Sequence, residues 1–381
     1  MTRNLHILFL IDFFHGSGGT ERHLSLLVCK LCRHGFDVTV MVFDLGVNPL
    51  IDEMRHAGAS VVELSIARVY TPNAMIQAWR FLRLIKNKRI DIVQTFHQKA
   101  DTYGAIIARL AGVKHIISSR RDTGDYKKSH YVFISRLIES WFEKIIVVSD
   151  RVEDALLKKE GVDRNRIIKI YNGVDSEIFR PPEPQEAASA RQSLGLAPSD
   201  FVVGMVANFR PEKNHEALFA GALKAKPSIP ELKLLLIGGG PLFEHYSARY
   251  GHPASGDLDA IFTGSVHDVQ RYLYAMDVAC LIPKANEGFS NAVLEKMATG
   301  LPLIVSDIGG NAEAVTDGQN GFVIPPNDIG ALRQALVSLH ADPFERSNMG
   351  RESRRRVEQE FSLELMWRSH EKLYHSLCDD C

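Results

Sequence analysis

Two successive series of short apolar runs, separated by amphipathic segments, constrain the fold of this chain more than any other feature. Several runs are unbroken stretches of Val, Ile and Leu, which is typical of parallel strands buried on both faces. The segments between them, such as 21–33 and 74–87, have the pattern of amphipathic helices. The alternation therefore predicts doubly wound α/β architecture. The runs lie at 6–12, 37–43, 60–65, 91–96, 115–120, 144–149, 167–172, 201–209, 233–240, 260–266, 277–283, 302–307 and 321–325.

The alternation is interrupted once, at 172–200, where a turn signal at Asn172-Gly173 is followed by a stretch rich in Pro, Ala and Glu. A length of 381 residues fits such a division, because a single hydrophobic core rarely serves more than ~250–300 residues. We therefore expect one Rossmann-like domain at 1–175 and a second at 176–360.

After Asp328 the chain reads as helix to its end. We expect residues 361–381 to form a C-terminal helix that packs back toward the N-terminal domain. Ligands of open parallel sheets bind at the carboxyl ends of the strands, so two facing domains would place such ends on both walls of a central cleft.

Several classes of protein do not fit the composition. No apolar run approaches the ~20 residues of a membrane span, and Asp12 interrupts the first run, which favours a strand over a signal peptide. Without export, disulfides are not expected. The two C-x-x-C pairs do not predict zinc, because Cys29 and Cys32 fall in a helical pattern and Cys378 and Cys381 end the chain.

The charges are unevenly divided along the chain. Residues 1–175 hold 26 Lys and Arg against 19 Asp and Glu, although the whole chain has a formal net charge of −1. This excess favours an anionic partner such as lipid headgroups, and the basic amphipathic stretch 79–89 can rest on an anionic membrane. The alternative is an ordinary helix whose basic face is in water. We expect a cytoplasmic protein, associated with the inner face of the cytoplasmic membrane, and no nucleic acid partner.

The stretch EGFSNAVLEKMATG, which starts at Glu287, carries the clearest chemistry. Asn291–Thr299 reads as a short helix, with Ser290 as its N-cap and Gly300 where a C′ glycine ends it. The backbone N–H groups of a helix start suit a phosphate. Glu295, ~6 Å along the axis, can accept two ribose hydroxyls, and Glu287 can face the other end of the same ligand. The alternative is a capped helix with two solvated glutamates.

Other features of the second half are compatible with a diphosphate. Arg210 and Lys213 follow the first strand of the second domain, where two cations can clamp a diphosphate or lie in a solvated loop. The glycines at 238–240 and 309–310 allow the backbone to approach a ligand closely. Asp257-Leu258-Asp259 resembles a metal-binding D-x-D, but it lies in a loop and not after a strand, so it does not predict a metal site.

In the first half, three features stand at the ends of strands. Gly18 and Gly19 belong to a glycine-rich turn that either approaches a phosphate or simply makes a close βα connection. His97 follows the fourth strand, where a residue of the cleft or a structural histidine can stand. Arg121, followed by Asp122, either binds an anion or pairs internally.

Taken in order, these motifs resemble those of the retaining glycosyltransferases of sequence family four, which have the two-Rossmann GT-B fold. The resemblance spans nearly the whole chain. One departure is Asn208, where many members have an arginine; Arg210 is expected to supply that charge. The motifs are the turn at 16–20, IIKIYNGVD, VANFRPEKNHE, LLLIGGGP, EGFSNAVLEKMATGLPLIVSDIGGNAEAV and GFVIPP.

The resemblance implies a role for each candidate residue. Glu287 and His97 are assigned as catalytic, beside the transferred sugar, and Glu295 binds the donor ribose. The donor diphosphate is held by Arg210, Lys213 and the segment Gly288, Phe289, Ser290 and Asn291. Gly18, Gly19 and Arg121 are assigned to the cleft, as acceptor contacts or a phosphate loop.

The resemblance also implies the reaction: transfer of a sugar from a nucleotide-diphosphate sugar to a hydroxyl of a glycan or lipid-linked acceptor, with retention, in the biosynthesis of cell-surface polysaccharide, lipopolysaccharide or glycolipid. Protein cations can stabilise the leaving diphosphate, so neither a metal nor a cofactor is expected beside the donor, for which a UDP-sugar is favoured. The alternatives are a nucleotide-sugar epimerase or hydrolase on the same fold, and a non-catalytic protein that binds sugar nucleotides.

Overall fold

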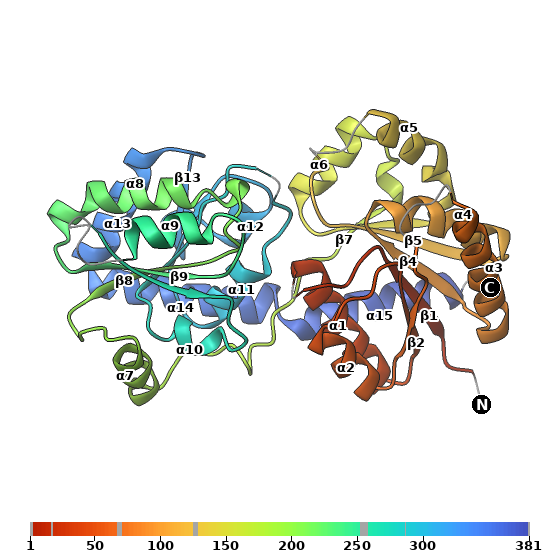
Figure 1. The fold of residues 1–381 in the computed structure, drawn as a ribbon, viewed down its shortest axis with the longest axis horizontal. Helices are drawn as coiled ribbons and strands as arrows, with labels where there is room; N and C mark the ends of the chain where they lie inside the picture. Colours follow the sequence, from red (N-terminus) through yellow and green to blue (C-terminus); the bar gives the residue numbers. More distant parts are fainter. Residues whose placement is uncertain are drawn as a thin grey trace. The chain divides into compact units, whose positions relative to one another are not determined.

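The computed structural model describes residues 3–16, 18–66, 71–124, 129–251, 258–285 and 287–379, and it divides into two compact units (Figure 1). The first unit is Met1–Asn172 with Glu364–Cys381, and the second is Gly173–Leu363. These limits differ by three residues from the expected limits at 175/176 and 361. The reason is local: the Val174 N–H donates to the Phe361 carbonyl and the Leu363 N–H to that of Val174, which keeps these residues in the second unit.

The first unit is built on a parallel sheet of seven strands in the order β3-β2-β1-β4-β5-β6-β7. Each of the seven runs read from the first half of the sequence contains one strand, so this part of the prediction is confirmed. The apolar side chains of the central strands β1 and β4 are almost completely buried, as expected for a sheet covered on both faces. The strands are β1 His6–Ile11, β2 Asp37–Val42, β3 Ser60–Glu63, β4 Ile92–Phe96, β5 His115–Arg120, β6 Lys144–Val147 and β7 Ile167–Lys169.

The helices of the first unit include one from the C-terminal end of the chain. The Tyr374 hydroxyl of α15 donates to Gln94 Oε1 on β4 at 2.7 Å, and the Trp367 ring lies 4.0 Å from that of His34 beside α1. In Figure 1, α15 accordingly runs beside α1. The helices are α1 Gly19–Arg33, α2 Pro49–His56, α3 Pro72–Lys88, the π-helical turn η1 Ala100–Gly104, α4 Ala105–Leu110, α5 Ser129–Ile138, α6 Asp150–Lys159 and α15 Leu363–Asp379.

The second unit has a parallel sheet of six strands in the order β10-β9-β8-β11-β12-β13. These strands coincide with the six runs of the second half, which again confirms the sequence pattern. Asp259, of the discounted D-x-D, begins β10 and pairs with Lys233, while Asp257 lies outside the described residues. The strands are β8 Phe201–Val206, β9 Leu232–Ile237, β10 Asp259–Gly264, β11 Val278–Leu281, β12 Leu303–Ser306 and β13 Gly321–Ile324.

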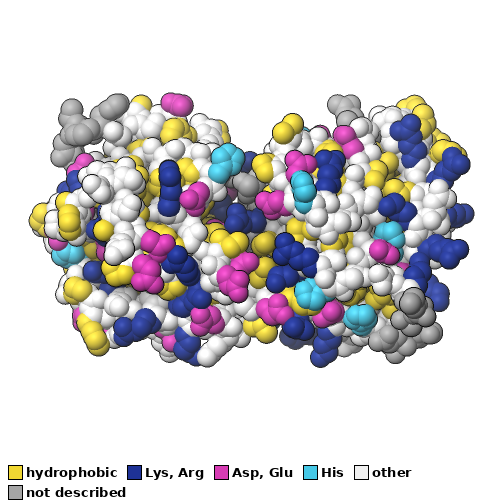
Figure 2. All heavy atoms as spheres, turned by 90° about the horizontal axis from the view of Figure 1, so that it is seen from below, with side chains coloured by type: hydrophobic (Ala, Val, Ile, Leu, Met, Phe, Trp, Pro, Cys, Tyr) yellow, Lys and Arg dark blue, Asp and Glu magenta, His cyan; other side chains and the backbone are white. Residues whose placement is uncertain are grey.

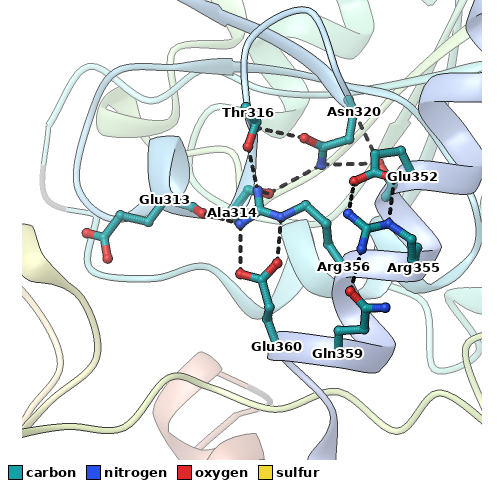
Figure 3. Close-up of polar contacts among 10 residues, drawn as sticks. Glu313, Ala314, Thr316, Asn320, Glu352, Arg355, Arg356, Gln359 and Glu360 are labelled. Atoms are coloured by element: carbon teal, nitrogen blue, oxygen red, sulfur yellow. Dashed lines mark hydrogen bonds and ion pairs between the residues drawn. The ribbon is translucent and has the colours of Figure 1, made fainter.

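Helix α14 is joined by hydrogen bonds to the end of α12 and to the loop between α12 and β13 (Figure 3). The Arg356 guanidinium donates to the Ala314 carbonyl at 2.7 Å and to Thr316 Oγ1 at 3.0 Å, and it also pairs with Glu360. Buried Asn320 accepts from the Thr316 N–H at 2.7 Å. The helices of this unit are α7 Pro184–Ser193, the 3-10 turn η4 Pro211–Lys213, α8 His215–Ala225, α9 Phe243–Tyr250, α10 Gln270–Leu273, α11 Asn291–Ala298, α12 Asn311–Ala314, α13 Ile329–Ala341 and α14 Pro343–Glu360.

Each sheet has one switch point, where the connections that follow two neighbouring strands run in opposite directions along the sheet. In the first unit it lies between β1 and β4, and in the second between β8 and β11. Ligands of such sheets bind at the carboxyl ends of these strands. In the described ranges, no helix has the length and apolar character needed to cross a bilayer.

Candidate functional site

Lys213 and Glu287 meet at the switch point of the second unit. The Lys213 Nζ lies 2.5 Å from Glu287 Oε2, and the two side chains are only 23% and 11% exposed. Lys213 comes from η4, which follows β8, and Glu287 from the loop that follows β11. The Lys284 N–H donates to the Glu212 carbonyl at 2.9 Å, so the two loops are also joined through the backbone. Two residues singled out from distant motifs are therefore brought into direct contact.

Helix α11 begins at Asn291, as the sequence pattern predicts, and ends at Ala298, one residue before the predicted end at Thr299. Gly300 follows in a left-handed conformation with φ of 81°. Ser290 occupies the N-cap position, but its hydroxyl makes no capping bond within the described part of the chain. Side-chain capping by Ser290 was therefore the wrong expectation. Glu295, one turn into the helix, is buried.

Arg210 does not join Lys213. It is exposed at the start of η4, and its guanidinium forms no hydrogen bond or ion pair with the residues that the structure describes. Its backbone N–H donates to the Asn208 carbonyl at 2.8 Å. Of the two expected cations, only Lys213 is held against Glu287.

The glycines that follow β9 and β12 lie close to protein backbone. A Cβ on Gly309 would lie 2.0 Å from the Glu287 carbonyl oxygen, and the Gly310 N–H donates to the Gly288 carbonyl at 2.5 Å. A Cβ on Gly238 would likewise lie 2.2 Å from the Ala207 carbonyl oxygen. These glycines shape the site by letting two loops pack together.

Lys296 belongs to this region, although sequence reasoning missed it. Its side chain is completely buried, and its Nζ donates to the Cys280 carbonyl of β11 at 3.1 Å. Burial lowers the pKa of Lys296 to about 8, an effect partly opposed by Cys280 and the carboxylate of Glu295. The sequence carried no signal for it, because lysine is rarely buried and usually marks a solvated helix face.

His97 lies at the switch point of the first unit, directly after β4. Its φ of 72° is in the left-handed region, which is uncommon for a residue with a side chain. The ring stacks on Phe13 with centroids 4.8 Å apart. Burial lowers the pKa of His97 to about 4, so the imidazole is neutral at pH 7 and can exchange hydrogen bonds with uncharged hydroxyls.

Asp12, which follows β1, holds the turn that carries His97. Its carboxylate accepts the Lys99 N–H at 2.9 Å and the Ala100 N–H at 2.6 Å, which fixes the start of η1. Burial raises the pKa of Asp12 to about 7, against the two backbone hydrogen bonds. A usable signal was present: an acidic residue directly after an otherwise apolar first strand.

The remaining candidates of the first unit surround the start of α1. Gly18 is the N-cap residue and Gly19 begins the helix, and a Cβ on Gly18 would lie 2.3 Å from Glu21 Oε2. Arg121 donates to Asn172 Oδ1 at 2.5 Å, and burial lowers the pKa of Arg121 to about 9, against the attraction of Asp122 and Glu21.

The preceding residue, Arg120, is used internally. Its guanidinium lies 2.7 Å from a carboxylate oxygen of Asp101, and both side chains are buried. Arg120 therefore pairs internally, with Asp101. Arg121 is oriented by its hydrogen bond to Asn172 and by the nearby carboxylates of Asp122 and Glu21.

Within the described ranges, no three His, Cys, Asp or Glu side chains are grouped so as to hold a metal ion. Cys29, Cys32 and Cys280 are free thiols, and Cys381 lies outside the described residues.

Two family models match the chain. The model for Glycosyltransferase Family 4 matches residues 17–178, and the model for glycosyl transferases group 1 matches residues 200–342. Together they cover the elements from α1 to β7 and from β8 to α13, and nearly all residues of the motifs that carried the resemblance.

Curated relatives agree with the models. UDP-Gal:alpha-D-GlcNAc-diphosphoundecaprenol alpha-1,3-galactosyltransferase of Escherichia coli is 30% identical over 323 residues, 81% of each chain. A GDP-mannose-dependent monoacylated alpha-(1-6)-phosphatidylinositol monomannoside mannosyltransferase of Corynebacterium glutamicum is 29% identical, over 51% of this chain and 52% of its own length.

Solved structures share the fold. A glycosyltransferase from Rickettsia africae superposes with a TM-score of 0.86 at 18% identity, over 99% of this chain and all of its own. Anabaena Alr3699/HepE, in complex with UDP and glucose, gives a TM-score of 0.82 at 20% identity, over 96% and 98%. At these identities the likeness establishes the GT-B architecture and nothing about substrates.

Proposed function

The chain belongs to glycosyltransferase family 4, and from this we propose that it transfers a hexose from a UDP-sugar to a hydroxyl of a lipid-linked glycan, with retention of configuration. The observation that carries the proposal is the contact between Lys213 and Glu287 beside the start of α11. It places one cation and one carboxylate at the switch point of the sheet, where sheets of this type bind nucleotides.

The donor site that we propose is centred on α11. Lys213 and the backbone of the segment 288–291 bind the diphosphate, with Arg210 reaching it from its exposed position on η4. Glu295 lies one turn inside the helix, and its negative charge would repel a phosphate. We therefore assign it to the ribose, whose hydroxyls can donate hydrogen bonds to the carboxylate.

Departure of the nucleotide is the step that the protein's cations assist. Negative charge grows on the leaving diphosphate, and a fixed ammonium and helix amides bind that state more strongly than the intact donor. The Glu287 carboxylate keeps the Lys213 ammonium in position before the donor binds. We propose that no metal ion takes part.

Glu287 and His97 act on the sugar in this proposal. The sugar passes through a cationic state, which the Glu287 carboxylate stabilises electrostatically. Neutral His97, held by Asp12 through the turn at η1, binds a sugar hydroxyl. Attack from the face that the leaving group vacates, with the diphosphate taking the acceptor's proton, gives retention.

The acceptor is proposed from the relatives. The Escherichia coli relative acts, by its name, on a diphosphoundecaprenol-linked sugar, and a lipid-linked acceptor of this kind requires work at a membrane surface. We therefore place the reaction in the biosynthesis of a cell-surface polysaccharide or glycolipid, at the cytoplasmic face of the membrane. Gly18, Gly19 and Arg121 are proposed contacts for the acceptor or its phosphate.

Binding of UDP and 2′-deoxy-UDP by calorimetry tests the donor site. The wild-type chain should bind UDP more tightly than 2′-deoxy-UDP. Glu295→Ala should reduce the ratio of the two affinities about tenfold, because one charge-assisted hydrogen bond contributes ~1.5 kcal/mol or more. Glu216→Ala, an exposed position on α8, is the matched control and should change nothing. An unchanged preference in Glu295→Ala would remove the ribose role.

Product analysis tests the reaction. Wild-type enzyme, UDP-sugars and a crude lipid fraction should give a glycosylated lipid whose new linkage has the donor's anomeric configuration. Release of free sugar without any acceptor would favour a hydrolase, and binding without turnover would favour a sugar-nucleotide-binding protein. Sugar transfer should continue when a chelator removes divalent cations. Loss of transfer under these conditions would contradict the proposal that no metal ion takes part.

A further inference from the structure

Phe13 is an exposed aromatic residue at the carboxyl edge of the first sheet. It follows β1 at the switch point of the first unit and is 44% exposed, whereas the next residue, Phe14, is completely buried. On the face of the molecule shown in Figure 2, hydrophobic side chains lie scattered among charged ones, so exposure alone does not mark a site. The significance of Phe13 depends on how its ring is held and on the groups beside it.

The Phe13 ring is held by stacking. It lies nearly parallel to the His97 imidazole, with an interplanar angle of 13° and the two centroids 4.8 Å apart. His97 follows β4, the strand next to β1, and its turn is fixed by the two hydrogen bonds that Asp12 accepts. One face of the Phe13 ring is therefore covered by protein, and its exposed part belongs to the opposite face and the edges.

The segment that carries this ring is joined to the loop after β2. The Phe14 N–H donates to the Asp44 carbonyl at 3.0 Å, and the Gly46 N–H donates to the Phe14 carbonyl at 3.2 Å. Farther along the same loop, the side-chain amide of buried Asn48 donates to the Gly16 carbonyl at 2.7 Å. The backbone beneath the ring is thus already fixed, so a ligand that uses the ring does not have to order the segment first.

Two side chains that can bind hydroxyls stand beside the ring. The centre of the His15 imidazole lies 6.3 Å from that of Phe13, and its Nε2 lies 2.9 Å from Asp44 Oδ2. The His15 and Asp44 side chains are 52% and 64% exposed, so their remaining donor and acceptor positions are open to a ligand. A Cβ on Gly46 would lie 3.0 Å from the His15 Cα, so a glycine at this position allows the two segments to pack closely.

An aromatic face with hydrogen-bonding groups at its edge suits a sugar ring. One face of a pyranose presents C–H groups, whose slight positive charge is attracted to the negative face of an aromatic ring. The hydroxyls of the same pyranose project around its rim, where a carboxylate can accept hydrogen bonds and an imidazole can donate one. A glycerol or another open-chain polyol has no flat face of this kind.

We propose that Phe13 is the platform on which the terminal pyranose of the acceptor packs, with His15 and Asp44 binding its hydroxyls. The inference rests on the proposed function, in which His97 contacts the transferred sugar. The acceptor hydroxyl must lie next to that sugar, and the Phe13 ring is in contact with His97. The donor's diphosphate and ribose are assigned to the second unit, which leaves the ring for the acceptor. The acceptor therefore ends in a sugar ring and not in an open-chain headgroup.

Saturation-transfer NMR tests the platform without requiring turnover. With UDP present, the wild-type chain should transfer saturation to the C–H protons of at least one of the methyl α-D-pyranosides of glucose, galactose and N-acetylglucosamine, and not to the open-chain polyol sorbitol. Phe13→Leu keeps an apolar side chain but removes the aromatic ring, and it should weaken pyranoside binding about five- to tenfold. Phe13→Tyr keeps the ring and should restore binding.

Sugar transfer tests the assignment to the acceptor. With a UDP-sugar and a limiting amount of crude lipid fraction, Phe13→Leu should lower the rate about five- to tenfold. The deficit should shrink as more lipid fraction is added, because loss of a binding contact raises KM more than it lowers kcat. Phe344→Leu, which changes a phenylalanine that is 72% exposed on α14 of the second unit, is the matched control and should leave the rate unchanged.

The proposal is overturned if the wild-type chain binds no pyranoside, or if Phe13→Leu binds pyranosides as tightly as wild type. A smaller thermal shift caused by UDP in Phe13→Leu would assign the ring to the donor and overturn it too. The two ideas fail separately. Pyranoside binding that depends on the Phe13 ring, without any sugar transfer, would count against the proposed function alone. Sugar transfer that Phe13→Leu leaves unchanged at limiting acceptor would refute the platform alone.

Discussion

The Lys213 ammonium lies 2.5 Å from a carboxylate oxygen of Glu287, two residues that are 74 positions apart in the chain and stand on loops after neighbouring strands β8 and β11. The pair is largely shielded from water, so its electrostatic attraction is screened less than that of a surface ion pair. The Lys213 ammonium is thereby held in a fixed position in the site that we propose for the donor diphosphate.

This pairing predicts thermodynamic coupling between the two side chains. In a cycle of Lys213→Met, Glu287→Gln and the double variant, urea unfolding should give a coupling of about 1 kcal/mol, because each single change leaves a partly buried charge alone. Lys213→Met should also weaken UDP binding about 10- to 100-fold. Lys284→Met, an exposed lysine in the adjacent loop, is the control. If the effects of the two single variants on the free energy of unfolding simply add in the double variant, the contact does not contribute to stability.

Lys296 predicts a stability difference that depends on pH. Burial lowers the pKa of Lys296 to about 8, below its ordinary 10.5, so the unfolded chain binds more protons between these values and wild-type stability rises with pH across that window. Lys296→Met lacks this group. The variant's stability relative to wild type should therefore fall by on the order of 2 kcal/mol between pH 7 and pH 9.5. A difference in urea midpoints that is the same at both pH values would contradict the burial of a titrating amine.

Acid should destabilise the first unit through its buried histidines. Burial lowers the pKa of His23 well below 6.5, and burial lowers the pKa of His370, whose ring lies 5.7 Å from it, to about 4. The unfolded chain therefore binds more protons below pH 6.5, and stability falls as pH falls. His23→Leu should flatten the loss of thermal stability between pH 6.5 and pH 4.5. His56→Gln, on the surface of α2, should reproduce the wild-type slope, and an equal slope in His23→Leu would refute the assignment.

The left-handed backbone of His97 predicts an unusual order of variant stabilities. Alanine is normally better tolerated than glycine inside a fold, but at a φ of 72° glycine has no Cβ to strain. His97→Gly should therefore be more stable than His97→Ala by about 1 kcal/mol in thermal or urea unfolding. Both should lower sugar transfer, because both lose the imidazole. Greater stability of the alanine variant would mean that the turn relaxes and is not held by Asp12.

Much of the fold was predictable because its signals are local. Strands buried on both faces are built from apolar side chains, and each of the thirteen runs read from the sequence overlaps one strand of the two sheets. The helix from Asn291 and the left-handed Gly300 after it follow in the same way from spacing and from a residue without a Cβ.

Other features depend on partners far away in the chain. Which of two nearby cations meets Glu287, and which of two adjacent arginines turns inward to Asp101, cannot be read from neighbours in sequence. The glycines at 309–310 illustrate the same limit: the sequence shows that the backbone must be approached closely, but not that the approaching group is the loop of Glu287.

The sequence by itself determined the alternating elements, the two sheets, the family and the residues that carry its chemistry, because apolar periodicity, turn residues and motifs are properties of consecutive positions. Only the tertiary structure decided that Lys213 is held by Glu287, that Lys296 is buried and that Asp12 supports His97. Burial and ion pairing are decided by which surfaces meet after the strands have assembled, and that information is distributed over the whole chain.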